Sequence, residues 1–229
     1  MRNLFTSLLI VAATLPVAAQ KIDMVSFSGF GSKAVIYFVT SDRITLVLNT
    51  DGGIEETGTD YGRNTLGYWP GRLNQYMGRT ENYPATENEA VRGKLRYIGL
   101  TLLTWNSSYE EAATVGKIRS IGGMPVEYYP SFEDEAVKGK IKKIGPTTFT
   151  YFSAFDNESL RGKLRSISNT NIDYYTSFDD KALRGKIKNI GGFPFTYFSS
   201  FENIQGRQGM LKSGFQMQYI NGINFYVRN

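Results

Sequence analysis

Five glycines recur at intervals of 23 residues in the middle of this 229-residue chain, and each begins a near-copy of the same segment. They are Gly93, Gly116, Gly139, Gly162 and Gly185. A typical segment opens Gly-Lys-Ile-Lys-Lys-Ile-Gly over residues 139–145. Self-similarity at a fixed spacing indicates a repeat architecture, in which each unit buries its apolar groups against its neighbours. The period therefore restricts the fold class before any single residue is given a role.

One unit, residues 139–161, contains two short strand patterns. Residues 139–145 are short, bounded by glycines and free of helix caps, and residues 149–155 are rich in aromatic and hydroxyl residues; turn residues separate the two stretches. The loop at 145–148 is predicted to hold three or four residues. We therefore expect an all-β fold: an elongated, twisted antiparallel sheet of tandem 23-residue β-hairpin repeats, with irregular N- and C-terminal β caps.

Apolar residues recur at fixed positions of each unit. In the first strand they lie three residues apart, as Ile141 and Ile144 do, which a regular strand would place on opposite faces. Either a bulge intervenes or both faces are partly covered, and we favour the second interpretation because tyrosine and lysine stems can cover a sheet. A further aligned aromatic column is assigned to the second strand: Tyr109, Phe132, Phe155, Phe178 and Phe201.

The chain divides into four predicted segments. Residues 1–19 have a basic start, a short apolar core and small residues before Gln20, which is typical of a secretory signal peptide; an uncleaved anchor helix is the alternative. Residues 20–85 contain a hairpin around 41–43 and, at 71–78, a degenerate first repeat strand. Residues 86–207 hold the five repeats. Residues 208–229 form a capping hairpin around Asn221-Gly222, with Met210 in phase with Ile187.

Composition narrows the function classes. The chain has no cysteine and no histidine, so disulfides and histidine-based catalysis are excluded. The formal charge is +5, or +4 without Arg2, and no long basic block suggests nucleic acid. We expect an exported protein that is periplasmic, cell-surface or extracellular, with no transmembrane helix in the mature chain.

A basic ladder is the main candidate binding feature. Two cationic columns are two residues apart, so a regular strand would place both on one face, beside an aromatic column of the partner strand. Such a surface could bind an anionic or sugar-rich polymer, or keep the sheet soluble. The columns are Lys94, Lys117, Lys140, Lys163 and Lys186; Arg96, Arg119, Lys142, Arg165 and Lys188; and Trp105, Tyr128, Tyr151, Tyr174 and Tyr197.

Acidic residues recur in each turn and have two interpretations. Stacked carboxylates such as Glu133 and Asp134 could hold calcium. The fixed order of a calcium loop is missing, so we favour turn chemistry and pairing with nearby arginine and lysine, and predict no metal site and no cofactor. Two carboxylates could also catalyse glycoside hydrolysis, but repeated acids lack the asymmetry of a catalytic pair.

The alternation of a Gly-Lys-Ile-Lys-x-Ile-Gly strand with a Tyr-Tyr-x-Ser-Phe strand, over residues 86–207, resembles exported tandem β-hairpin repeat proteins of uncharacterised function. In outline the unit also resembles the MORN repeat. The resemblance implies a hairpin architecture and no particular activity.

The combined prediction is a non-catalytic exported repeat protein. It would present an extended sheet for binding or scaffolding at the cell envelope, with a glycan, an anionic polymer or an envelope protein as partner. An outer-membrane β-barrel is the alternative, although its strands would need about 9–11 residues. A carboxylate-based glycosidase is a further, weaker alternative.

Overall fold

The protein is entirely β in the part of the chain that the structure describes, residues 20–28, 33–60, 71–202, 206–214 and 217–227. This computed structural model contains twenty strands there and no helix, which confirms the predicted all-β hairpin fold. No described segment is a helix long and apolar enough to cross a membrane. The predicted signal peptide, residues 1–19, lies outside the described residues.

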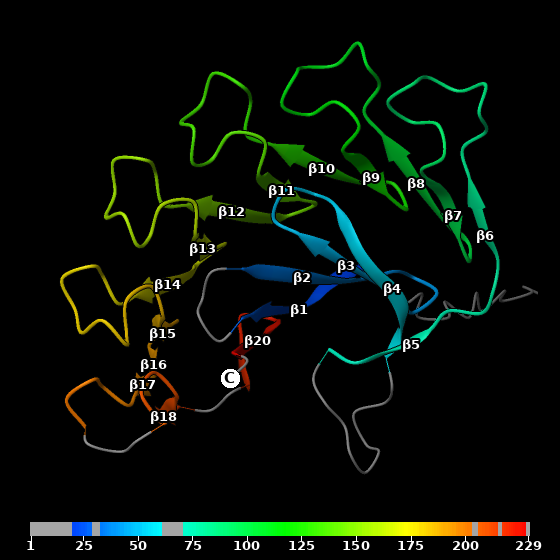
Figure 1. The fold of residues 1–229 in the computed structure, drawn as a ribbon. Coiled ribbons are helices and arrows are strands. Elements are labelled where there is room, and N and C mark those ends of the chain that lie inside the picture. The colour runs from blue at the N-terminus through cyan, green and yellow to red at the C-terminus, as the bar shows by residue number, and fades with distance from the viewer. Residues whose placement is uncertain (1–19, 29–32, 61–70, 203–205, 215–216, 228–229) are drawn as a thin grey trace, which may run out of the picture.

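The repeats form one open, eleven-stranded antiparallel sheet in which sequential strands are neighbours, from β6 to β16. Figure 1 shows this sheet curving as an arc around a second sheet. Its strands are β6 (Thr80–Asn82), β7 (Leu95–Ile98), β8 (Thr101–Trp105), β9 (Ile118–Ile121), β10 (Met124–Tyr128), β11 (Ile141–Ile144), β12 (Thr147–Tyr151), β13 (Leu164–Ile167), β14 (Thr170–Tyr174), β15 (Ile187–Ile190) and β16 (Phe193–Pro194).

Each hairpin turns through two residues. Ile144 pairs directly with Thr147, so Gly145 and Pro146 form the loop, and the expected three- or four-residue loop was wrong. Gly145 has a φ of +52°. The equivalent Ser168 adopts a φ of +47°, where glycine is otherwise favoured. These tight turns keep successive strands in constant register.

A β-bulge in every repeat explains the three-residue spacing of the core positions. Glu127 pairs with Lys143, but the next residue, Tyr128, pairs with Ile141, so Lys142 is the extra residue. The same shift recurs between β12 and β13 and between β14 and β15. Because the extra residue restores the alternation, Ile141 and Ile144 are both fully buried on one face. The favoured interpretation, coverage of both faces, was therefore wrong.

The second sheet has seven strands and combines both ends of the chain, in the order β19-β20-β1-β2-β3-β4-β5. All neighbours are antiparallel except β1 and β20, which are parallel. The strands are β1 (Lys21–Phe27), β2 (Ala34–Val39), β3 (Ile44–Asn49), β4 (Ile54–Asp60), β5 (Leu73–Gln75), β19 (Met217–Ile220) and β20 (Ile223–Val227).

Two terminal segments were assigned to the wrong sheet. Residues 71–78 contain β5, which pairs with β4 and is not a degenerate repeat strand. The capping hairpin β19–β20 does form around Asn221-Gly222, but it pairs with β1 and not with the last repeat. Local patterns specify each strand and leave its partner open, because pairing depends on which edge is free in the folded molecule.

The last repeat is shifted by one residue. Strand β17 (Thr196–Tyr197) pairs with β18 (Leu211–Ser213), and Tyr197 lies opposite Leu211. Leu211 therefore takes the place of Ile187, and Met210 takes the lysine position. The expected phase, with Met210 equivalent to Ile187, was wrong because the preceding loop is one residue longer.

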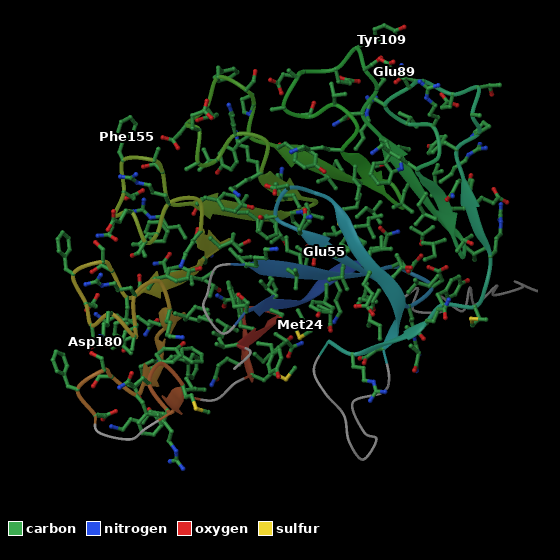
Figure 2. All side chains as sticks on the ribbon, in the orientation of Figure 1. Met24, Glu55, Glu89, Tyr109, Phe155 and Asp180 are labelled. Atoms are coloured by element: carbon green, nitrogen blue, oxygen red, sulfur yellow. The ribbon has the colours of Figure 1, made fainter. Side chains whose placement is uncertain are left out.

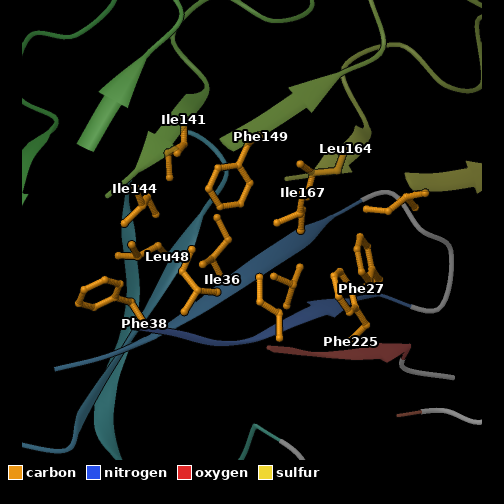
Figure 3. Close-up of a cluster of buried hydrophobic side chains, with 14 of the residues drawn as sticks. Phe27, Ile36, Phe38, Leu48, Ile141, Ile144, Phe149, Leu164, Ile167 and Phe225 are labelled. Carbon is orange, nitrogen blue, oxygen red and sulfur yellow. The ribbon is translucent and has the colours of Figure 1, made fainter. Parts of the chain in front are cut away.

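The hydrophobic core lies between the two sheets. Phe27, Ile36 and Phe38 of the terminal sheet and Ile144 and Phe149 of the repeat sheet are buried in one cluster. Figure 3 shows these side chains meeting across the gap between the layers. The terminal sheet thus occupies the concave face of the repeat sheet, and the loops between the hairpins and the convex face remain for binding.

Candidate functional site

The lysine column of the basic ladder lies on the inner side of the repeat sheet, where Lys186 is buried and the other four lysines are partly buried. Each ammonium group lies 4.7–5.6 Å from the ring centre of one aromatic residue. These aromatic residues form the inner aromatic column: Trp105, Tyr128, Tyr151, Tyr174 and Tyr197. Lys163 Nζ also donates to the Gly185 carbonyl at 2.6 Å, and Lys117 donates in the same way to Gly139. These lysines stabilise the junctions between successive repeats.

The inner aromatic column is part of the core. Tyr128, Tyr151, Tyr174 and Tyr197 are 5–8% exposed. The hydroxyl groups of Tyr128 and Tyr151 donate to the carbonyls of Ile118 and Ile141. Burial raises the pKa of Tyr128 well above its usual value. These four rings cannot form the predicted binding surface; Trp105, which is only partly buried, is the exception.

The second cationic column is exposed and lies apart from the lysine column. Its members stack over a second aromatic column, as Lys142 does over Tyr129 at 5.5 Å and Arg165 over Phe152 at 5.6 Å. Arg119 instead pairs with Glu110 at 3.6 Å. The prediction that both cationic columns share one face was wrong. The lysine, such as Lys140, precedes the strand, and the second cation, such as Lys142, is the extra residue of the bulge. The members are Arg96, Arg119, Lys142, Arg165 and Lys188.

The outer loops are the lobes that project from the arc in Figure 1. Each links a second strand to the next first strand, and backbone bonds close its base, such as Tyr129 N–H to Lys140 O at 2.9 Å. The five complete loops of the repeats cover residues 83–94, 106–117, 129–140, 152–163 and 175–186.

One side chain per outer loop links it to the following loop. Asp134 Oδ1 accepts from the backbone N–H of Ala136 in its own loop and of Ala154 in the next, both at 2.8 Å. Asn157 Oδ1 does the same for Ser159 and Ser177. These contacts support turn chemistry as the role of the repeated acids. Among the described residues, no group of three or more acidic side chains could hold a metal ion.

The outer loops carry a row of exposed aromatic side chains that the sequence interpretation placed in strands. Figure 2 shows Tyr109 and Phe155 projecting outward from two of these loops. The five side chains are 85–95% exposed, whereas aromatic residues are normally largely buried. We call them the rim aromatics: Tyr109, Phe132, Phe155 and Phe178, in the last four of the five complete loops, and Phe201, in the loop that follows them.

Local sequence held a signal for this placement. Each rim aromatic is followed by an acid, and a hydroxyl or proline residue stands two or three positions before it. In the structure the Asp156 carboxylate accepts a hydrogen bond from the Ser153 backbone N–H at 2.6 Å. This bond closes a turn that directs Phe155 away from the sheet. Repetition of the aromatic residue predicted a strand position, whereas the turn residues around it indicate a loop.

An open groove lies where the first two repeats face the β3–β4 turn. Its volume is about 510 Å³, and Lys94, Trp105, Lys117, Asn49 and Asp51 contribute to its lining. A smaller cavity of about 230 Å³ continues past Asp51 toward Lys140 and Lys163. The lysine column thus borders a groove along part of its length.

No protein-family model matches the chain, and comparisons with curated proteins and with solved structures also give no match. The resemblance to exported hairpin-repeat proteins and to the MORN repeat stays a prediction.

Proposed function

We propose that this chain is a non-catalytic, exported binding protein whose rim aromatics contact a polysaccharide of the cell envelope. The observation that carries the proposal is five aromatic side chains, each at least 85% exposed, at one equivalent position of successive repeats. Exposed apolar surface that recurs in this way marks an interaction site, because leaving it in water costs free energy without helping the fold. The exported location rests on the predicted signal peptide.

The chemistry around the rim favours a glycan over an anionic polymer. Every rim aromatic is followed directly by an acid, such as Glu133 after Phe132 and Asp179 after Phe178. Carboxylates repel polyanions and accept hydrogen bonds from sugar hydroxyls. Aromatic faces pack against the C–H faces of sugar rings. Isolated rings separated by polar groups suit such a ligand better than they suit the continuous apolar core of a protein interface.

The arrangement of the rim favours a flexible chain over a flat surface. The loops radiate from the arc, so Tyr109 and Phe155 project in different directions (Figure 2). A plane would contact few of them at once. A polymer with repeating units can follow the arc and use several rings, which raises its apparent affinity through multivalency.

Replacing Phe132, Phe155 and Phe178 together by alanine tests the proposal. With each contact worth about 1 kcal/mol, we expect retention on immobilised envelope polysaccharide to weaken about 100-fold. Because no charge is removed, the loss should be equal at low and high salt. Binding is measured with the mature chain by biolayer interferometry.

The matched control is Tyr219→Ala, which removes an aromatic side chain that is 71% exposed on β19, away from the rim. It should leave binding unchanged. Retention that survives the triple variant would remove the rim from the function. Retention that disappears in high salt and on replacement of Arg119 and Lys142 would assign binding to the exposed cations.

A further inference from the structure

The 510 Å³ groove has the size of a small-molecule site and lies apart from the rim. The start of β7, the end of β8, the residues just before β9 and the β3–β4 turn surround it. Its lining combines two ammonium groups, an indole and polar groups of the turn: Lys94, Lys117, Trp105, Asn49 and Asp51.

The groove is open because the β3–β4 turn is attached to the third repeat, whereas the groove lies beside the first two. The Ile141 backbone N–H donates to the Thr50 carbonyl at 2.7 Å. Gly52 packs so closely on Tyr128 that a Cβ there would collide with the tyrosine hydroxyl. These contacts hold the turn against Tyr128 of the second unit and Ile141 of the third. Lys94 and Lys117 line the space left beside the turn, where Lys117 Nζ also donates to the Gly139 carbonyl.

Trp105 provides a fixed aromatic wall. Its Nε1–H donates to the Leu95 carbonyl at 2.7 Å, and Lys94 Nζ lies 4.7 Å from the indole centroid. The other four repeats carry tyrosine at this position, and those rings are buried. The partly buried indole is therefore a local departure from the repeat, located where the groove is open.

The groove holds more positive than negative charge. Asp51 is the carboxylate in its lining, and it pairs with Lys140 at 3.5 Å. Within the described residues, Lys94 has an aromatic contact but no ion pair within 4 Å. Burial and the charge of Lys140 lower the pKa of Lys117, partly offset by Asp51. A bound anion would stabilise both ammonium groups.

We propose that this groove binds an acidic sugar, with its carboxylate held by Lys94 and Lys117 and its ring beside Trp105. Asn49 and the turn backbone supply hydrogen-bonding groups for the sugar hydroxyls. The proposal does not depend on the rim, since none of the rim aromatics lines the groove.

Fluorescence of Trp105 tests it directly. The chain contains two tryptophans, so Trp69→Phe leaves Trp105 as the single reporter. This chain is titrated with glucuronate, glucose and inorganic phosphate. We expect a saturable change with glucuronate and at least tenfold weaker responses with glucose and phosphate. No saturable change with glucuronate would overturn the proposal, and equal affinities for glucuronate and either other probe would overturn the acidic-sugar assignment.

Variants locate the site. Lys94→Gln should weaken glucuronate binding at least tenfold, and Lys94→Arg should restore most of it. Lys142→Gln, an exposed cation outside the groove, is the matched control and should bind normally. An equal loss in both glutamine variants would overturn the proposal. The Phe132/Phe155/Phe178 triple variant should bind glucuronate normally, so that failure of the groove and failure of the rim are distinguished.

Discussion

Lys163 shows how the fold changes the properties of a repeated residue. Its ammonium group lies 5.3 Å from the Tyr174 ring centre and donates to the Gly185 carbonyl. Burial, with a smaller contribution from the Lys186 charge, lowers the pKa of Lys163 to about 8. Burial also lowers the pKa of Lys186. The charged form is therefore disfavoured in the folded chain relative to the unfolded one.

We expect the free energy of unfolding to rise between about pH 8 and pH 10. In this range the unfolded lysine, with a pKa of 10.5, keeps its proton while folded Lys163 loses it, so the folded state gains stability as pH increases. Above pH 10 the trend reverses, because buried tyrosines such as Tyr128 have a raised pKa and the unfolded chain loses those protons first. Urea unfolding at several pH values measures both the rise up to pH 10 and the fall above it.

The control is Lys163→Met, which keeps an apolar stem and removes the titrating group. Its stability should rise less from pH 8 to pH 10 than that of the original chain. Parallel pH profiles for the two proteins would contradict the assignment of the rise to Lys163.

At the scale of elements, stacking of the outer loops depends on a small number of side-chain acceptors. Asp134 serves two backbone N–H groups in successive loops, and Asn157 occupies the equivalent position one repeat later. The carbonyl oxygen of asparagine and one carboxylate oxygen of aspartate thus fill the same role. The rim aromatics are held in their positions by loops that are connected in this way.

Replacing Asp134 by alanine should lower the free energy of unfolding by about 1–3 kcal/mol, because two backbone donors lose their acceptor. Asp134→Asn retains the Oδ1 acceptor and should cost much less. Urea denaturation of both variants gives the comparison. Equal losses in the two would mean that the negative charge, and not the loop-to-loop acceptor, supplies the stability.

At the scale of the whole molecule, the repeat sheet and the terminal sheet share one core. Phe38 of β2 and Phe149 of β12 are both fully buried in it. A long repeat array can be stable through contacts between neighbouring repeats alone. Here the inner face of the array is also covered by strands from the two ends of the chain, so neither layer has a complete core by itself.

Phe38→Ala should therefore destabilise both layers, by about 3–5 kcal/mol as for other buried phenylalanines. Hydrogen exchange should accelerate in β11 to β14 as well as in β1 to β4, in a single cooperative transition. Tyr219→Ala, on an exposed side chain, is the control and should change little. Faster exchange confined to the terminal sheet would contradict the shared core.

Much of the local structure followed from the sequence. The 23-residue period, the glycine-bounded strands and the turn pairs predicted the hairpins, and Asn221-Gly222 predicted the last one. Predictions about faces were less successful. Lys94 and Arg96 were placed together by a period of two, but a bulge separated them. Repetition predicted a strand position for Phe155, although the turn residues around it indicate a loop.

The repeating hairpin unit follows from the amino-acid sequence, because strand propensity, tight turns and register are set by residues close together in the chain. Which strands join which sheet, which lysines become buried and where a groove stays open depend on the folded molecule. Those outcomes depend on contacts between residues far apart, such as Thr50 with Ile141 and β1 with β20. The same local pattern is compatible with many such pairings, and burial of the shared core selects one of them.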